Sequence, residues 1–138
     1  MKKTIQIFTS FDELSVAFAK RLSDEIVKTP KERFYSIALS GGSTPRTVFK
    51  FIAENYAEKI NWSRLLVFWG DERCVPPDHA ESNYRMAFQS LLSYITIPDL
   101  NIFRIQGEND PLDEAKNYSG IVNKLVLHKN GIPQFDLF

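Results

Sequence analysis

The sequence predicts an α/β fold in which an open, mostly parallel sheet is covered by helices on both faces. Short apolar segments alternate with longer segments of helical periodicity along the whole chain. The segments 34–39 and 65–69 are almost continuously apolar, which is typical of parallel strands that are buried on both faces. We therefore expect a Rossmann-like arrangement, with residues 1–138 forming a single domain.

The first predicted elements are a short strand and an amphipathic helix. Residues 4–8 are rich in strand-forming residues and predict an opening strand. Ser10 and Glu13 have the spacing of a capping box, which predicts a helix start. The Thr29–Pro30 pair ends that helix. Its buried face is marked by apolar residues at every fourth position, namely Leu14, Phe18, Leu22 and Ile26.

The centre of the predicted sheet is formed by the two apolar segments. The strand at 34–39 leads into a glycine-rich run, and the strand at 65–69 leads into the polar segment 70–73. Two prolines make residues 75–78 irregular. The helix after the glycine-rich run is expected to bury Val48, Ile52 and Tyr56.

The next predicted elements are a helix over about residues 83–92, capped by Ser82 or Asn83, and a short strand over 102–105. A further helix opens at Asp110–Pro111. We expect its inward-facing residues to be Ala115, Tyr118, Val122 and Leu125.

Asn130–Gly131 is expected to close this last helix, and residues 135–138 to begin a fifth strand.

Charge and cysteine content limit the possible classes of function. The chain has 17 basic and 17 acidic residues, and no basic block is present, which argues against binding to nucleic acid or to a membrane surface. The single cysteine allows no internal disulfide. No apolar segment has the length of a signal peptide core or a membrane span. We therefore expect a cytoplasmic protein, and we expect it to be a monomer.

The segment Ser40-Gly41-Gly42-Ser43-Thr44-Pro45 is the most informative motif in the chain. Its glycines allow a ligand to approach the backbone, and Pro45 suits the first turn of a helix. A helix N-terminus with free N–H groups binds anions such as phosphate. An ordinary turn capped by Thr44 would need only one glycine. The motif has neither the P-loop nor the dinucleotide pattern, so it favours a phosphate monoester. The predicted phosphate-binding residues are Gly41, Gly42, Ser43 and Thr44.

A second polar motif, Gly70-Asp71-Glu72-Arg73, follows the strand at 65–69. Ligands of open parallel sheets bind outside the carboxyl ends of the strands, so both motifs are expected to line one crevice. In an extended segment Asp71 and Arg73 share a side and Glu72 points away, towards the rest of the structure. Arg73 can then bind phosphate, and Asp71 can orient or deprotonate a substrate group. The alternative is a surface turn with a loose ion pair.

Other reactive side chains have simpler explanations. His79 is expected to be solvated or to fix its loop, and His128 to interact with a helix C-terminus. Cys74 is expected to be a packed small residue, because no histidine is paired with it. No histidine or cysteine has a second ligand at metal-binding spacing, so no metal site is expected. The aromatic residues expected in the core are Trp62, Phe68 and Trp69.

With these motifs the chain resembles the 6-phosphogluconolactonases and the wider glucosamine-6-phosphate deaminase superfamily. Deaminases typically have Asp-Glu-Tyr where this chain has Asp71-Glu72-Arg73, so Arg73 favours the lactonases. The segments that match the lactonase pattern in order and spacing are 39–45, 68–76 and 82–84, continued by 97–98, 101–102 and 104–105.

The resemblance implies hydrolysis of 6-phosphoglucono-δ-lactone to 6-phosphogluconate, in the pentose phosphate pathway, without a cofactor or a required metal. It implies that the glycine loop and Arg73 hold the phosphate and that Asp71 lies at the reacting centre as a catalytic residue. The family's general base is a histidine in a segment just after the strand that corresponds to residues 135–137. The sequence ends at Phe138, so we expect the C-terminal part of the fold, including this histidine, to be missing. Two alternatives stay open: a deaminase or isomerase of glucosamine 6-phosphate, and a non-catalytic phosphosugar-binding domain.

Overall fold

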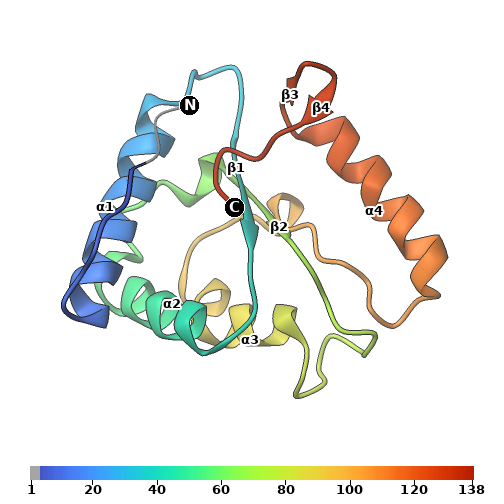
Figure 1. The fold of residues 1–138 in the computed structure, drawn as a ribbon, viewed down its shortest axis with the longest axis horizontal. Coiled ribbons are helices and arrows are strands. Elements are labelled where there is room, and N and C mark those ends of the chain that lie inside the picture. The colour runs from blue at the N-terminus through green and yellow to red at the C-terminus, as the bar shows by residue number, and fades with distance from the viewer. Residues whose placement is uncertain (1–3) are drawn as a thin grey trace.

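The computed structural model describes residues 4–138 and has two parallel strands at its centre, β1 (Tyr35–Leu39) and β2 (Leu65–Trp69). Every residue of both strands is buried. The register pairs Tyr35 with Leu65 and Leu39 with Trp69, so both strands end at the same edge of the sheet (Figure 1). The predicted α/β class and both central strands are confirmed.

Single parallel bridges extend this sheet on both sides. Leu137 pairs with Ile37 of β1, and Ile102 pairs with Val67 of β2. The Ala38 N–H donates to the Leu137 carbonyl at 3.0 Å, and the Phe103 N–H donates to the Val67 carbonyl at 2.8 Å. The segments predicted as strands at 102–105 and 135–138 therefore lie in the sheet but pair over shorter lengths than expected.

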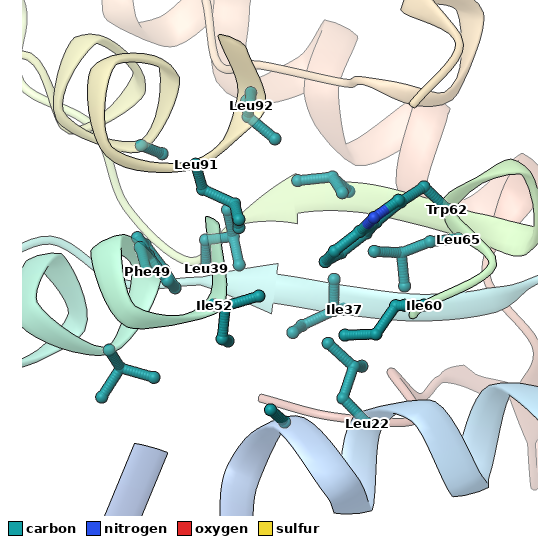
Figure 2. Close-up of a cluster of buried hydrophobic side chains, with 14 of the residues drawn as sticks. Leu22, Ile37, Leu39, Phe49, Ile52, Ile60, Trp62, Leu65, Leu91 and Leu92 are labelled. Atoms are coloured by element: carbon teal, nitrogen blue, oxygen red, sulfur yellow. The ribbon is translucent and has the colours of Figure 1, made fainter. Parts of the chain in front are cut away.

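Helices cover both faces of the sheet, as predicted (Figure 1). On one face, α1 (Phe11–Lys28), α2 (Ser43–Tyr56) and α3 (Asn83–Ser90) pack against the strand side chains that point towards them. Figure 2 shows Leu22 and Ile52 on that face together with Ile37 and Leu39. The opposite face is covered by α4 (Pro111–Leu125). Short 3₁₀ turns lie at Trp62–Arg64, Leu92–Tyr94 and Asp99–Asn101.

Local capping explains where these helices begin. The Glu13 N–H donates to the Ser10 hydroxyl at the start of α1, and Ser82 and Asp110 cap α3 and α4 in the same way. The Glu13 carboxylate, however, accepts from Thr9 and not from the Ser10 backbone, so the predicted capping box is shifted by one residue. None of the helices in residues 4–138 is long and apolar enough to cross a lipid bilayer.

The predicted strand over residues 4–8 is wrong, because this segment has no regular secondary structure. Its residues Ile5 and Ile7 are 86% and 91% exposed. A strand needs a neighbouring strand to pair with its backbone groups, and none lies beside this segment within the described residues. Strand-forming composition alone therefore does not produce a strand here.

The predicted end of the last helix is also wrong. α4 ends at Leu125, and Asn130–Gly131 instead forms the turn of a hairpin between β3 (His128–Lys129) and β4 (Ile132–Pro133). Both turn residues have positive φ angles, 53° and 78°, which is the conformation that favours Asn-Gly in two-residue hairpins. His128 accordingly lies in an exposed strand and not at a helix C-terminus.

The inward face of α4 is only partly as predicted. Tyr118 and Val122 pack against the sheet, whereas Ala115 and Leu125 are exposed. The buried position of this helix is Glu114, whose carboxylate accepts a hydrogen bond from the Gln106 N–H at 2.9 Å. A paired polar residue can occupy a buried helix position that an apolar pattern does not reveal.

Candidate functional site

The loops that follow β1 and β2 lie side by side at the carboxyl edge of the sheet. The Gly70 N–H donates to the Leu39 carbonyl at 3.0 Å, so the two chains are still paired where the polar motifs begin. The glycine-rich run and the segment 70–73 therefore start from adjacent points. This is the placement expected for a ligand site outside the carboxyl ends of parallel strands.

The glycine-rich run ends directly in the first turn of α2. Gly42 is the residue before the helix and has a φ of 113°, a conformation that favours glycine. The helix begins at Ser43, so Pro45 is its third residue and the alternative turn with Thr44 as the cap is wrong. Gly42 offers no side chain to this helix end, and the N–H groups of Ser43 and Thr44 have no partner within residues 4–138.

Glu72 turns towards the rest of the structure, as predicted, and holds the start of α3. Its carboxylate accepts hydrogen bonds from the N–H groups of Asn83 and Tyr84 at 2.7 and 2.8 Å and from the Ser82 hydroxyl at 3.0 Å. A carboxylate at a helix N-terminus also interacts favourably with the helix dipole. Glu72 is therefore a structural residue that ties the second polar motif to α3.

A polar cavity of about 250 Å³ lies between these loops, and we call it the arginine cavity. Two arginines, Arg46 and Arg73, contribute to its wall. Neither makes an ion pair in the part of the chain that the structure describes. The cavity is lined by Gly42, Arg46, Arg73, Ala80, Glu81, Ser82, Asn83 and Met86.

Arg46 was not predicted from the sequence. It lies in the first turn of α2, and its N–H donates to the Gly42 carbonyl at 3.3 Å. The sequence does contain a signal for it, because a residue four positions after the glycine at a helix start remains within the first turn and beside the same loop. A basic side chain at this position can reach an anion bound at the helix N-terminus.

A second cavity, of about 480 Å³, lies between residues 71–74 and α4. Asp71, Glu72 and Arg73 all line it, so the expectation that Asp71 and Arg73 share a side of the segment stays a prediction. Arg73 lines both cavities and lies between them. Cys74 also lines the second cavity and is exposed, so the expectation that it is packed is wrong.

The remaining predicted residues occupy different surroundings. Gly41 lies against the side chain of Asn83, and Ser43 is exposed at the start of α2. Thr44 is exposed and lines an apolar groove of about 200 Å³ between α1, β1 and α2 and not the arginine cavity. His79 is exposed, and its Nδ1 accepts from the Glu81 N–H at 3.2 Å, which agrees with the expected role of fixing its loop.

The predicted core aromatic residues Trp62, Phe68 and Trp69 are each no more than 2% exposed, as expected.

Residues 9–138 match the protein family described as glucosamine-6-phosphate isomerases/6-phosphogluconolactonase. The chain belongs to this family. It is similar to a 6-phosphogluconolactonase of Treponema pallidum, with 38% identity over 88% of the chain and 49% of the relative, and to one of Haemophilus influenzae, with 39% identity over 91% and 53%. Its fold is similar to that of a 6-phosphogluconolactonase from Trypanosoma brucei, with a TM-score of 0.79, 30% identity, and coverage of 93% of this chain and 52% of that one. The chain thus spans about half the length of the relatives it matches.

Proposed function

We propose that this chain binds the phosphate group of 6-phosphoglucono-δ-lactone and contributes Asp71 to the hydrolysis of that lactone. The observation that carries the proposal is the arginine cavity at the carboxyl edge of the sheet. It is lined by two arginines that form no ion pair within the described residues and by Gly42, the residue directly before α2.

A phosphate monoester suits this cavity better than a carboxylate or an uncharged sugar. Arg46 and Arg73 can each offer two parallel N–H donors, which match the oxygen spacing of a phosphate. Gly42 also lines the cavity and directly precedes α2, so the positive end of the helix dipole lies beside it. This arrangement attracts a phosphate dianion more strongly than it attracts a singly charged group.

Asp71 lines the neighbouring cavity, so a sugar held by its phosphate beside Arg73 can extend towards the Asp71 carboxylate. In the proposed reaction a water molecule attacks the lactone carbonyl carbon, the bond to the ring oxygen breaks, and that oxygen takes a proton. Asp71 can orient the water or a sugar hydroxyl by accepting a hydrogen bond from it. In the family that the chain resembles, the general base is a histidine. It lies in the segment just after the strand that corresponds to residues 135–137.

Binding measurements test this proposal without requiring turnover. Calorimetric titration is expected to show binding of 6-phosphogluconate and a much weaker binding of gluconate, which lacks the phosphate. The affinity for 6-phosphogluconate is expected to fall as salt is added, because exposed charges are screened. Equal affinity for the two ligands would contradict the phosphate site.

A second assay distinguishes the reaction. Hydrolysis of 6-phosphoglucono-δ-lactone above the spontaneous rate supports the proposed activity, whereas release of ammonia from glucosamine 6-phosphate would support the deaminase alternative. Phosphosugar binding without either reaction would support a binding domain. A cytoplasmic monomer remains our expectation.

A further inference from the structure

Asn83 connects the two polar motifs through its side chain. It is the first residue of α3 and is only 7% exposed. Its Nδ2 donates to the Asp71 backbone carbonyl at 3.1 Å and to the Asp71 carboxylate Oδ1 at 3.3 Å. Among residues 4–138 this amide is the sole hydrogen-bond partner of the Asp71 side chain, which is otherwise exposed.

The start of α3 does not need this amide. The N–H groups of Asn83 and Tyr84 donate to the Glu72 carboxylate, and the N–H of Arg85 donates to the Ser82 hydroxyl at 3.1 Å. The first three free N–H groups of the helix are therefore satisfied without the Asn83 side chain. The Asn83 amide is therefore available to donate to the loop that carries Asp71.

The glycine-rich run leaves space for this side chain. A Cβ atom on Gly41 would collide with the Oδ1 of Asn83 and would lie 2.6 Å from its Cγ. Unlike Gly42, Gly41 does not have a positive φ, so its backbone conformation does not require glycine. The absence of a side chain at Gly41 lets the Asn83 amide lie between the two loops.

Asn83 is itself held in place. The Glu72 carboxylate accepts from its N–H at 2.7 Å, a charge-assisted bond that fixes the backbone of Asn83 to the same loop that carries Asp71. Its carboxamide lies against Gly41 and donates to two acceptors in Asp71, the backbone carbonyl and the carboxylate Oδ1. These contacts leave the amide little freedom to turn.

We propose that Asn83 is a positioning residue that holds the Asp71 carboxylate in one orientation at the edge of the glycine loop. The chemical consequence rests on the proposed function. If a phosphate is held beside Arg73 and the Asp71 carboxylate is held by Asn83, the distance between the two groups stays constant. Displacement of a reacting group by a small distance can lower a rate by about 100-fold. Asn83 contributes by removing that freedom.

The orientation of Asp71 can be measured without any ligand. Three-bond NMR couplings from the Asp71 Cγ to its backbone nitrogen and carbonyl carbon report the χ1 rotamer. We expect values of a single rotamer in the parent protein and averaged values in Asn83→Ala and in Asn83→Asp. The second variant keeps the shape beside Gly41 but replaces the donor by an acceptor. Asn55→Ala, which removes an exposed asparagine from α2, serves as the control and leaves the couplings unchanged.

Steady-state kinetics of the parent and of the two Asn83 variants gives the second readout. We expect both variants to lower kcat for 6-phosphoglucono-δ-lactone by roughly 10- to 100-fold. Asn83→Ala is expected to leave KM within about two-fold, because Arg46 and Arg73 are unchanged, whereas Asn83→Asp adds a negative charge at the arginine cavity and is expected to raise KM. Unchanged Asp71 couplings in folded Asn83→Asp would overturn the positioning role. A parent protein that neither binds 6-phosphogluconate nor hydrolyses the lactone would overturn the proposed function, while the couplings would still decide the role of Asn83.

Discussion

Arg33 and Asp136, which are 103 residues apart in the sequence, form a bidentate ion pair with both N···O distances at 2.9 Å. The same carboxylate accepts from the N–H and the hydroxyl of Ser36, at 2.9 and 3.0 Å. Burial raises the pKa of the Asp136 carboxyl, but the bonds from Arg33 and Ser36 outweigh this effect and leave the pKa below its ordinary value. The ion pair, with Asp136 charged, therefore stabilises the segment that lies beside β1.

Asp136→Asn is expected to lower the free energy of unfolding by about 2–3 kcal/mol, because the guanidinium of Arg33 loses a half-buried charged partner. Urea unfolding at neutral pH, with the exposed Asp24→Asn as the control, measures this difference. A loss no larger than that of the control would show that the pair contributes nothing net.

The same pair predicts a dependence on pH. Because the pKa of Asp136 is lower in the folded protein than in the unfolded chain, its contribution is fully present above the unfolded value of about 3.9. The contribution is lost as the pH falls through the folded value. The stability difference between the parent and Asp136→Asn is therefore expected to be constant from about pH 7 to pH 5 and to shrink at lower pH. A difference that persists undiminished at low pH would contradict this assignment.

Glu72→Gln is expected to destabilise the protein by about 1.5–3 kcal/mol, because an amide group replaces one of two oxygens that accept from the start of α3. The glutamine NH₂ cannot accept from an N–H group, so at least one donor at the helix start loses its partner. Glu81→Gln, in the exposed loop just before α3, is the matched control and is expected to be neutral. Chemical denaturation of the two variants provides the comparison, and equal effects would argue against the role of Glu72.

Much of this architecture could be predicted because its signals are local. β2 begins and ends as its apolar run predicts, and Ser10, Ser82 and Asp110 cap helices where the sequence indicates. The prediction that Glu72 turns towards the rest of the structure is confirmed by its bonds to the start of α3.

The parts that could not be predicted depend on distant partners. Residues 4–8 resemble a strand in composition, but pairing decides whether a strand forms. The Asn130–Gly131 signal supports either a helix end or a hairpin turn, and the geometry of the following chain decides between them. Arg46 and Asn83 acquire their places at the candidate site only when α2 and α3 pack beside each other.

Arg73→Ala is expected to weaken the binding of 6-phosphogluconate by about 1.5–3 kcal/mol, the range for a hydrogen bond to a charged group. Arg46→Ala is expected to weaken it in the same direction, and both variants are expected to keep the melting temperature of the parent, because both side chains are exposed. Arg21→Ala, on the exposed side of α1, is the control for a change in net charge. Calorimetry and thermal unfolding together make the test: unchanged affinity rejects the phosphate contact, and a large fall in melting temperature indicates structural pairing instead.

Gly41→Ala and Gly120→Ala are expected to change stability in opposite directions. A Cβ on Gly41 collides with the Asn83 carboxamide, whose Nδ2 donates to Asp71, so this variant is expected to lose about 1–3 kcal/mol through overpacking. A Cβ on Gly120 meets no atom within 4 Å and lies inside α4, so this variant is expected to gain about 0.5–1 kcal/mol.

The double variant Gly41→Ala/Asn83→Ala identifies the cause of the clash. Because the carboxamide is then gone, the alanine at position 41 is expected to cost much less than it does in the parent background. A cost that is equal in both backgrounds would show that a group other than Asn83 excludes the side chain, and the close approach of the two loops would then have a different origin.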